Sequence, residues 1–165
     1  MWTSSVAHPD SVNAQLADFL CARRDEIIRA WLGRVEADPA IAAETVTTNQ
    51  LRDHLPRMFD DLADTLRRHG SKNVAEQAEE AAEKHGAERW HQGFDVAGVL
   101  REIVHLREIF IYHLRVFEEQ HPDFGSAARL FAHTSVHRFL DDMALNALEQ
   151  FLDCEKRARR GVAGL

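Results

Sequence analysis

The chain has 165 residues, a length that predicts one domain able to bury a continuous core without disulfides or structural metals. Hydrophobic residues make up 45% of the sequence and charged residues 28%, with only four prolines, which excludes a disordered or fibrous protein. The formal net charge is −7, which argues against a broad nucleic-acid surface, because such surfaces depend on clustered Lys and Arg.

The two cysteines, Cys21 and Cys154, are far apart and belong to no CxxC pair. This usage indicates neither a disulfide framework nor a zinc ribbon, and it fits a reducing cytoplasm. The first ten residues lack the charged and apolar regions of a signal peptide, and no window approaches 18 uninterrupted apolar residues. We therefore expect a cytoplasmic protein that is neither secreted nor membrane-spanning.

Apolar residues recur at helical spacing along the chain, which predicts an all-α bundle of about five main helices. The first helix is expected to follow Asp10 or Ser11 as N-cap and to continue unbroken until Asp38-Pro39 ends it. Its apolar residues share one face: Leu16, Phe19, Leu20, Ile27, Trp31 and Val35.

The next two helices have weaker signals. The second is expected to begin near Thr48 and to stop at His69-Gly70, with a kink or restart at Pro56, because proline removes a backbone hydrogen bond inside a helix. The third is expected from about residue 72 to residue 90, with Gly93 closing it.

The last two helices carry clear start signals. Asp95 is the expected N-cap of a fourth helix from Val96 to about Gln120, and Ser126 opens a fifth. At ~1.5 Å per residue, a fifth helix that reaches Arg160 would be roughly 52 Å long. A compact chain of this size has a diameter of about 40 Å, so the end of this helix should project from the body.

Ionisable side chains are unusually frequent in the segment HGAERWHQGFDVAGVLREIVHLR, residues 85–107. On a helical wheel, Arg107 falls within the apolar arc of the fourth helix and Glu102 lies at its edge, while His85 and Arg89 share a face of the preceding helix. Because an inward guanidinium needs a carboxylate partner, we expect these four residues to form an internal polar network, with Arg107 paired to Glu102 or to a carboxylate of another helix. Such a network could fix helix register, bind a ligand or hold a metal.

Histidines provide another candidate site. His133 and His137 are four residues apart, which places both imidazoles on one helix face. With His105, His113 or His85 they could bind zinc or haem iron, although no third ligand stands at motif spacing. No cofactor is otherwise expected, so a haem- or metal-binding sensor is the alternative function.

No nucleophile elbow, zinc-protease motif, P-loop or dinucleotide fingerprint occurs, so catalysis is not expected. The fifth helix suggests an interaction surface instead. Its residues Ala144, Leu148, Phe151 and Ala158 are spaced by four, three and seven residues, as in a coiled coil. This spacing suits a parallel homodimer in which the two copies of the helix lead into an output module.

The pattern H-G-x-x-R-x-x-x-G-F at 85–94, followed by V-L-R-E at 99–102 and L-R at 106–107, resembles the RsbRD-type N-terminal domain, the RsbT co-antagonist sensory module. Two upstream segments are similar to that family's opening helices: FLCARRDEIIRAWLGRV at 19–35 and LRDHLPRMFDDLADTLR at 51–67. The likeness covers about residues 12–118.

The resemblance implies an all-helical signal-input domain rather than an enzyme, in a family whose stressosome members include globin-like folds without haem. Such domains stand ahead of stressosome output domains and of histidine-kinase cores in two-component systems. We therefore expect a tail at residues 1–11, a sensory domain at 12–138, and a signalling and dimer linker at 139–165 toward an output domain beyond Leu165. The resemblance names no small-molecule ligand.

Overall fold

The computed structural model describes residues 9–41, 55–68, 89–91 and 95–163, and these confirm the predicted all-α bundle. Within these ranges the main helices are α1 (Pro9–Ala22), α2 (Arg24–Ala37), α4 (Leu55–Arg68), α6 (Val96–Gln120) and α7 (Ser126–Ala163). No strand occurs among the described residues. Across those same ranges, no helix carries a long enough apolar stretch to cross a membrane.

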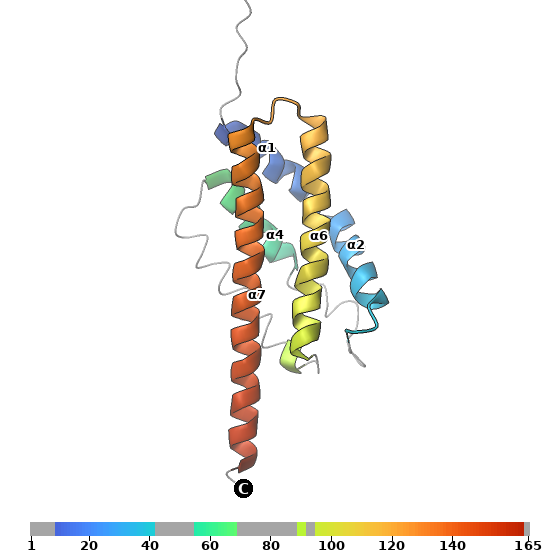
Figure 1. Ribbon diagram of the computed structural model, residues 1–165, viewed down its shortest axis with the longest axis vertical. Coiled ribbons are helices and arrows are strands. Elements are labelled where there is room, and N and C mark those ends of the chain that lie inside the picture. The colour runs from blue at the N-terminus through green and yellow to red at the C-terminus, as the bar shows by residue number, and fades with distance from the viewer. Residues whose placement is uncertain (1–8, 42–54, 69–88, 92–94, 164–165) are drawn as a thin grey trace, which may run out of the picture.

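The prediction of a single unbroken first helix is wrong. The chain breaks at Arg23, whose backbone has φ −100° and ψ 7°, and α1 and α2 run in different directions on either side of it (Figure 1). The Arg23 guanidinium lies 3.8 Å from the centre of the Phe19 ring, which stabilises the corner by a cation–π contact. A salt bridge of 3.8 Å from Arg24 to Asp60 then ties the start of α2 to α4.

The boundaries of the second and third predicted helices are only partly visible. Pro56 lies in the first turn of α4, a position where proline costs no helical hydrogen bond, so the described part of this helix starts beside the predicted restart. Of the predicted third helix, only residues 89–91 are described, and they are helical. The expected helix start at Thr48 and the closing Gly93 lie outside the described residues.

Helices α6 and α7 form a long antiparallel hairpin, joined at the upper end in Figure 1. Asp95 caps α6 as predicted, because its Oδ1 accepts a hydrogen bond of 2.6 Å from the Gly98 backbone N–H. At the other end, the His121 ring stacks on Phe117 at a centroid distance of 3.9 Å. The backbone N–H of Phe124 donates to the His121 carbonyl at 2.9 Å, which closes the turn into α7.

The remaining helices cover this hairpin. Helix α2 packs along α6, whereas α1 and α4 pack on each other and also contact α7. Aromatic rings fill the space between them, with ring centroids 5.1 Å apart for Phe59 and Phe110 and 5.3 Å apart for Phe19 and Phe117. Full burial of a side chain of this size stabilises the fold by about 1.5–3 kcal/mol. The bundle therefore has one continuous core around α6.

Helix α7 extends past the other helices, as its predicted length requires. It has 38 residues, which at ~1.5 Å per residue is about 57 Å. Its early part buries apolar side chains as far as Phe151, whereas every residue from Lys156 to Gly161 is exposed. Figure 1 shows this end running beyond the N-terminus of α6.

Candidate functional site

A buried ion pair joins the segment at residues 89–91 to helix α6. The Arg89 Nε donates to Glu102 Oε2 at 2.8 Å, and the two side chains are 0% and 1% exposed. The indole N–H of Trp31 in α2 donates to the backbone carbonyl of Glu102 at 2.9 Å, so a second helix meets α6 at the same residue. The 89–91 segment, α2 and α6 therefore meet at Glu102.

The burial of this pair has a physical consequence. Moving an isolated charge from water into a protein interior costs several kcal/mol, and only a close counter-charge with good hydrogen bonds offsets this cost. Arg89 and Glu102 can therefore be buried together but not separately. Their pairing fixes where the 89–91 segment docks on α6.

Arg107 does not join this pair. Its side chain is 29% exposed and forms a salt bridge with Asp141 of α7, while its Nη1 lies 3.1 Å from Nδ1 of His137. The predicted network of four residues is therefore divided: Arg89 and Glu102 are together, and Arg107 binds a carboxylate of another helix, the second of the two partners expected for it. His85 lies outside the described residues. The long Arg side chain starts from the edge of the apolar arc and reaches outward, as amphipathic side chains commonly do.

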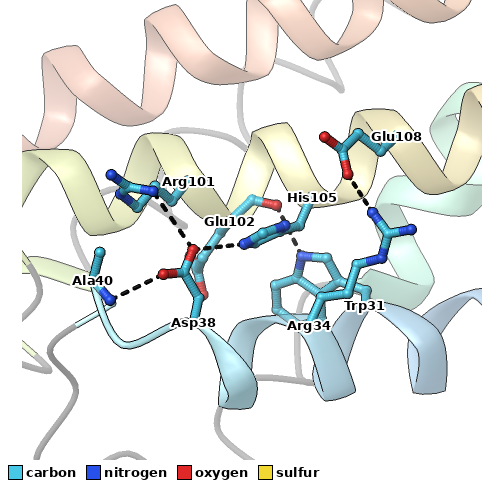
Figure 2. Close-up of polar contacts among 8 residues, drawn as sticks. All are labelled: Trp31, Arg34, Asp38, Ala40, Arg101, Glu102, His105 and Glu108. Atoms are coloured by element: carbon cyan, nitrogen blue, oxygen red, sulfur yellow. Dashed lines mark hydrogen bonds and ion pairs between the residues drawn. The ribbon is translucent and has the colours of Figure 1, made fainter.

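Polar contacts align along the seam between α2 and α6 (Figure 2). Trp31, Arg34 and Asp38 stand three and four residues apart, so they share the face of α2 that contacts α6. Arg34 forms a salt bridge with Glu108, which lies six residues beyond Glu102 on α6. These side chains follow successive turns of the same seam and fix the register of the two helices.

Asp38 ends this seam. Its carboxylate accepts from the Ala40 backbone N–H at 2.9 Å, contacts Nε2 of His105 at 2.8 Å, and lies 3.7 Å from Arg101 (Figure 2). The hydrogen bond from Ala40, followed by the one with His105, holds the pKa of the Asp38 carboxyl below its usual range. The carboxylate therefore ties the end of α2 to two successive turns of α6.

A similar cluster joins α6 to α7. Glu118 lies 2.7 Å from Nε2 of His133 and 3.7 Å from Arg129. Three of the five histidines considered for a metal site, His105, His133 and His137, therefore contact three different partners. Among the residues that the structure describes, no group of three or more metal-ligating side chains converges. The expected spacing of His133 and His137 holds, but their two rings serve separate contacts.

His113 is a buried polar residue whose burial sequence reasoning missed. It is 3% exposed, and within the described part of the chain its Nδ1 has no hydrogen-bond partner. Burial lowers the pKa of the His113 imidazole, an effect that the charge of Glu26 opposes and that of Arg23 reinforces. Helical spacing held the signal, since this residue lies three positions after Phe110 and four after Ile109 on the buried face.

The predicted relay residues of α7 differ in their surroundings. Phe151 is 5% exposed and packs within the core, whereas Ala158 is exposed. Ala144 and Leu148 are half-buried, and Leu145 beside them is 58% exposed. Phe151 is therefore part of the monomer core, and the apolar surface available to a partner is made by the other residues.

Comparison with known proteins gives one family. No curated protein and no solved structure matches the chain. The family model described as the RsbT co-antagonist protein rsbRD N-terminal domain matches residues 25–163, which include α2, α4, α6 and α7. The match covers most of the chain and extends well past the residues that carry the sequence resemblance. The chain therefore belongs to the RsbRD N-terminal domain family, a family of regulatory rather than catalytic domains.

Proposed function

We propose that this chain is a cytoplasmic signal-input domain that dimerises and passes a conformational change through α7 to an output module. A histidine-kinase core or a stressosome-type regulator fits this role. Family membership supports a regulatory function. The observation that carries the proposal is the shape of α7, a single helix of 38 residues that is part of the core at one end and fully exposed at the other.

The region around the buried Arg89–Glu102 pair is the proposed place where a signal changes the packing of the helices. It lies where the 89–91 segment, α2 and α6 meet, and Phe151 of α7 packs into the same core. A signal that favours one arrangement of these helices over another needs only a few kcal/mol of differential binding to shift their populations. Because α7 is continuous, a displacement at its packed part would move its exposed end.

The proposed dimer uses α7 of each chain side by side. Leu145 is 58% exposed, and the half-buried Leu148 follows it three residues later, one turn closer to the projecting end. Exposed apolar residues on a projecting helix favour pairing with a second copy, because parallel pairing buries both stripes at once.

Light scattering after size-exclusion chromatography tests the dimer. We expect the mass of two chains for the wild type and of one chain for Leu145→Glu, because a carboxylate would be buried in the interface. Tyr112→Glu, on the exposed face of α6, is the matched control, since Tyr112 is 61% exposed and lies outside α7. A wild-type chain that is a strict monomer, also when extended into the following helix turns, would remove the dimer from the proposal.

A further inference from the structure

A cavity of about 470 Å³ lies where α7 passes the N-terminal end of α6. Among the residues that the structure describes, six line it: Trp90, Asp95, Val96, Ala97, Phe151 and Glu155. Trp90 directly follows the buried Arg89, Asp95 caps α6, and Phe151 and Glu155 come from α7 just before its exposed end. The volume is in the range of small-molecule pockets, which is about 300–1,000 Å³.

The lining has a distinct chemical character. Two aromatic rings, Trp90 and Phe151, and two carboxylates, Asp95 and Glu155, contribute to it, and none of the six residues is cationic. Asp95 uses Oδ1 to cap α6, and Glu155 accepts from Arg159, whose side chain is 78% exposed and lies outside the lining. Aromatic faces attract organic cations, and carboxylates neutralise them, whereas an anion would meet two like charges.

We infer that this cavity binds a small organic cation, an amine or a quaternary ammonium compound, with Trp90 and Phe151 as walls and Asp95 and Glu155 as counter-ions. Val96 and Ala97 supply small apolar surface for the carbon part of such a ligand. The neighbouring Arg89 is not available as a competing cation, because it is fully buried and paired with Glu102.

The ligand would also link α6 to α7. Because the two elements contribute opposite sides of the cavity, a bound cation would favour the arrangement in which Asp95 and Glu155 are close. Its role as the stimulus rests on the proposed relay through α7, whereas binding itself does not.

Isothermal titration calorimetry of the full chain at low ionic strength tests the binding. The probes are choline, benzyltrimethylammonium and putrescine, with dimethylbutanol as the uncharged analogue of choline. We expect saturable binding of at least one cation, about tenfold tighter than any binding of dimethylbutanol. Asp95→Asn keeps the helix cap, because asparagine caps as well as aspartate, and removes only the charge.

The variants separate specific binding from general attraction to an acidic protein. Asp95→Asn and Glu155→Gln should each weaken cation binding several-fold and together at least tenfold, with unchanged thermal unfolding. Glu149→Gln is the matched control, since Glu149 is an exposed carboxylate on the same helix outside the cavity. Absence of saturable binding for all three cations, equal binding of dimethylbutanol, or an equal effect of Glu149→Gln would overturn the inference. Cation binding without any movement of α7 would leave the site standing and count against the relay alone.

Discussion

Arg89 and Glu102 form an ion pair with 2.8 Å between Nε and Oε2, and both side chains are withdrawn almost completely from solvent. The pair holds a segment from outside α6 on the middle of the bundle, at the residue that Trp31 of α2 also contacts. Each charge stabilises the other, because burying either one alone in its ionised form would cost several kcal/mol of folding free energy.

A double-mutant cycle on this pair measures that dependence. Arg89→Met and Glu102→Met should each lower the free energy of unfolding by about 3–5 kcal/mol, because each leaves an uncompensated buried charge. The double variant should be far more stable than the sum of the two losses predicts, since two apolar side chains then replace the pair. Urea unfolding gives these values, and additive losses in the double variant would show that the two charges are not coupled.

Arg107→Met should behave differently. Its partner Asp141 is 59% exposed, so the salt bridge is solvated, and its loss should change the free energy of unfolding by about 1 kcal/mol or less. Urea unfolding of Arg107→Met and Arg89→Met compares the two losses of stability for the same substitution, arginine to methionine. A loss from Arg107→Met as large as that from Arg89→Met would contradict the division of the predicted network into a buried and a surface pair.

Trp31→Phe tests the contact between α2 and α6. The substitution keeps an aromatic ring in the core but removes the hydrogen bond of 2.9 Å to the Glu102 carbonyl and part of the buried volume. We expect a loss of about 1–3 kcal/mol in the free energy of unfolding. Thermal and urea unfolding measure it, with Trp90→Phe as the control because the Trp90 side chain is only half-buried.

Acid should destabilise the fold through His113. Its pKa in the folded chain is lowered from 6.5, so the unfolded chain binds a proton there at a higher pH than the folded one does. The contribution of this residue to stability is therefore complete above about pH 7 and falls as the pH drops through about 6.5 toward the folded pKa. The pKa of Asp38 in the folded chain is also lowered. Its contribution to stability is therefore lost only in more acidic solution, as the pH falls below the ordinary carboxyl pKa of 3.8.

His113→Leu provides the measurement. The free energy of unfolding of the wild type minus that of the variant should decrease as the pH falls from about 7 to about 5. Over this range the imidazole takes up a proton more readily in the unfolded wild type than in the folded one, whereas leucine takes up none. His91→Asn, at an exposed position, is the matched control for loss of a histidine. A difference between His113→Leu and wild type that stays constant with pH would contradict the assignment.

Local signals in the sequence were sufficient to predict where α6 and α7 begin and that both are long helices. The Asp95 cap, the apolar periodicity and Ser126 at the start of α7 are all short-range features, and the structure places α6 at the predicted bounds. The break at Arg23 was not predictable by periodicity, because Leu20 and Ile27 are seven residues apart, about two helical turns. The two helices therefore stay in phase across a corner.

In the candidate site too, the spacing of residues in the sequence does not predict which helices pack together. A helical wheel placed Arg107 within one apolar arc and Glu102 at its edge, but it contains no information about which neighbouring helix covers either residue. The structure places Arg89 against Glu102 and Asp141 against Arg107, so tertiary packing decides the pairing. The role of Asp38 in binding His105 and Arg101 likewise depends on how α2 docks, and no spacing in the sequence encodes it.

The most direct test of the proposed relay is a distance measurement between α6 and α7 by double electron–electron resonance. Spin labels at Val104 and Arg157, both exposed, would be placed in a chain with Cys21 and Cys154 replaced by alanine, diluted with unlabelled protein to suppress distances between chains. Arg89→Met combined with Glu102→Met should shift the distance distribution by about 2 Å or more, as helix movements at regulatory interfaces do. Arg34→Met, which removes an exposed salt bridge between α2 and α6 and touches no residue of α7, is the control and should leave it unchanged. Identical distributions for all three proteins would contradict the claim that the buried pair controls the position of α7.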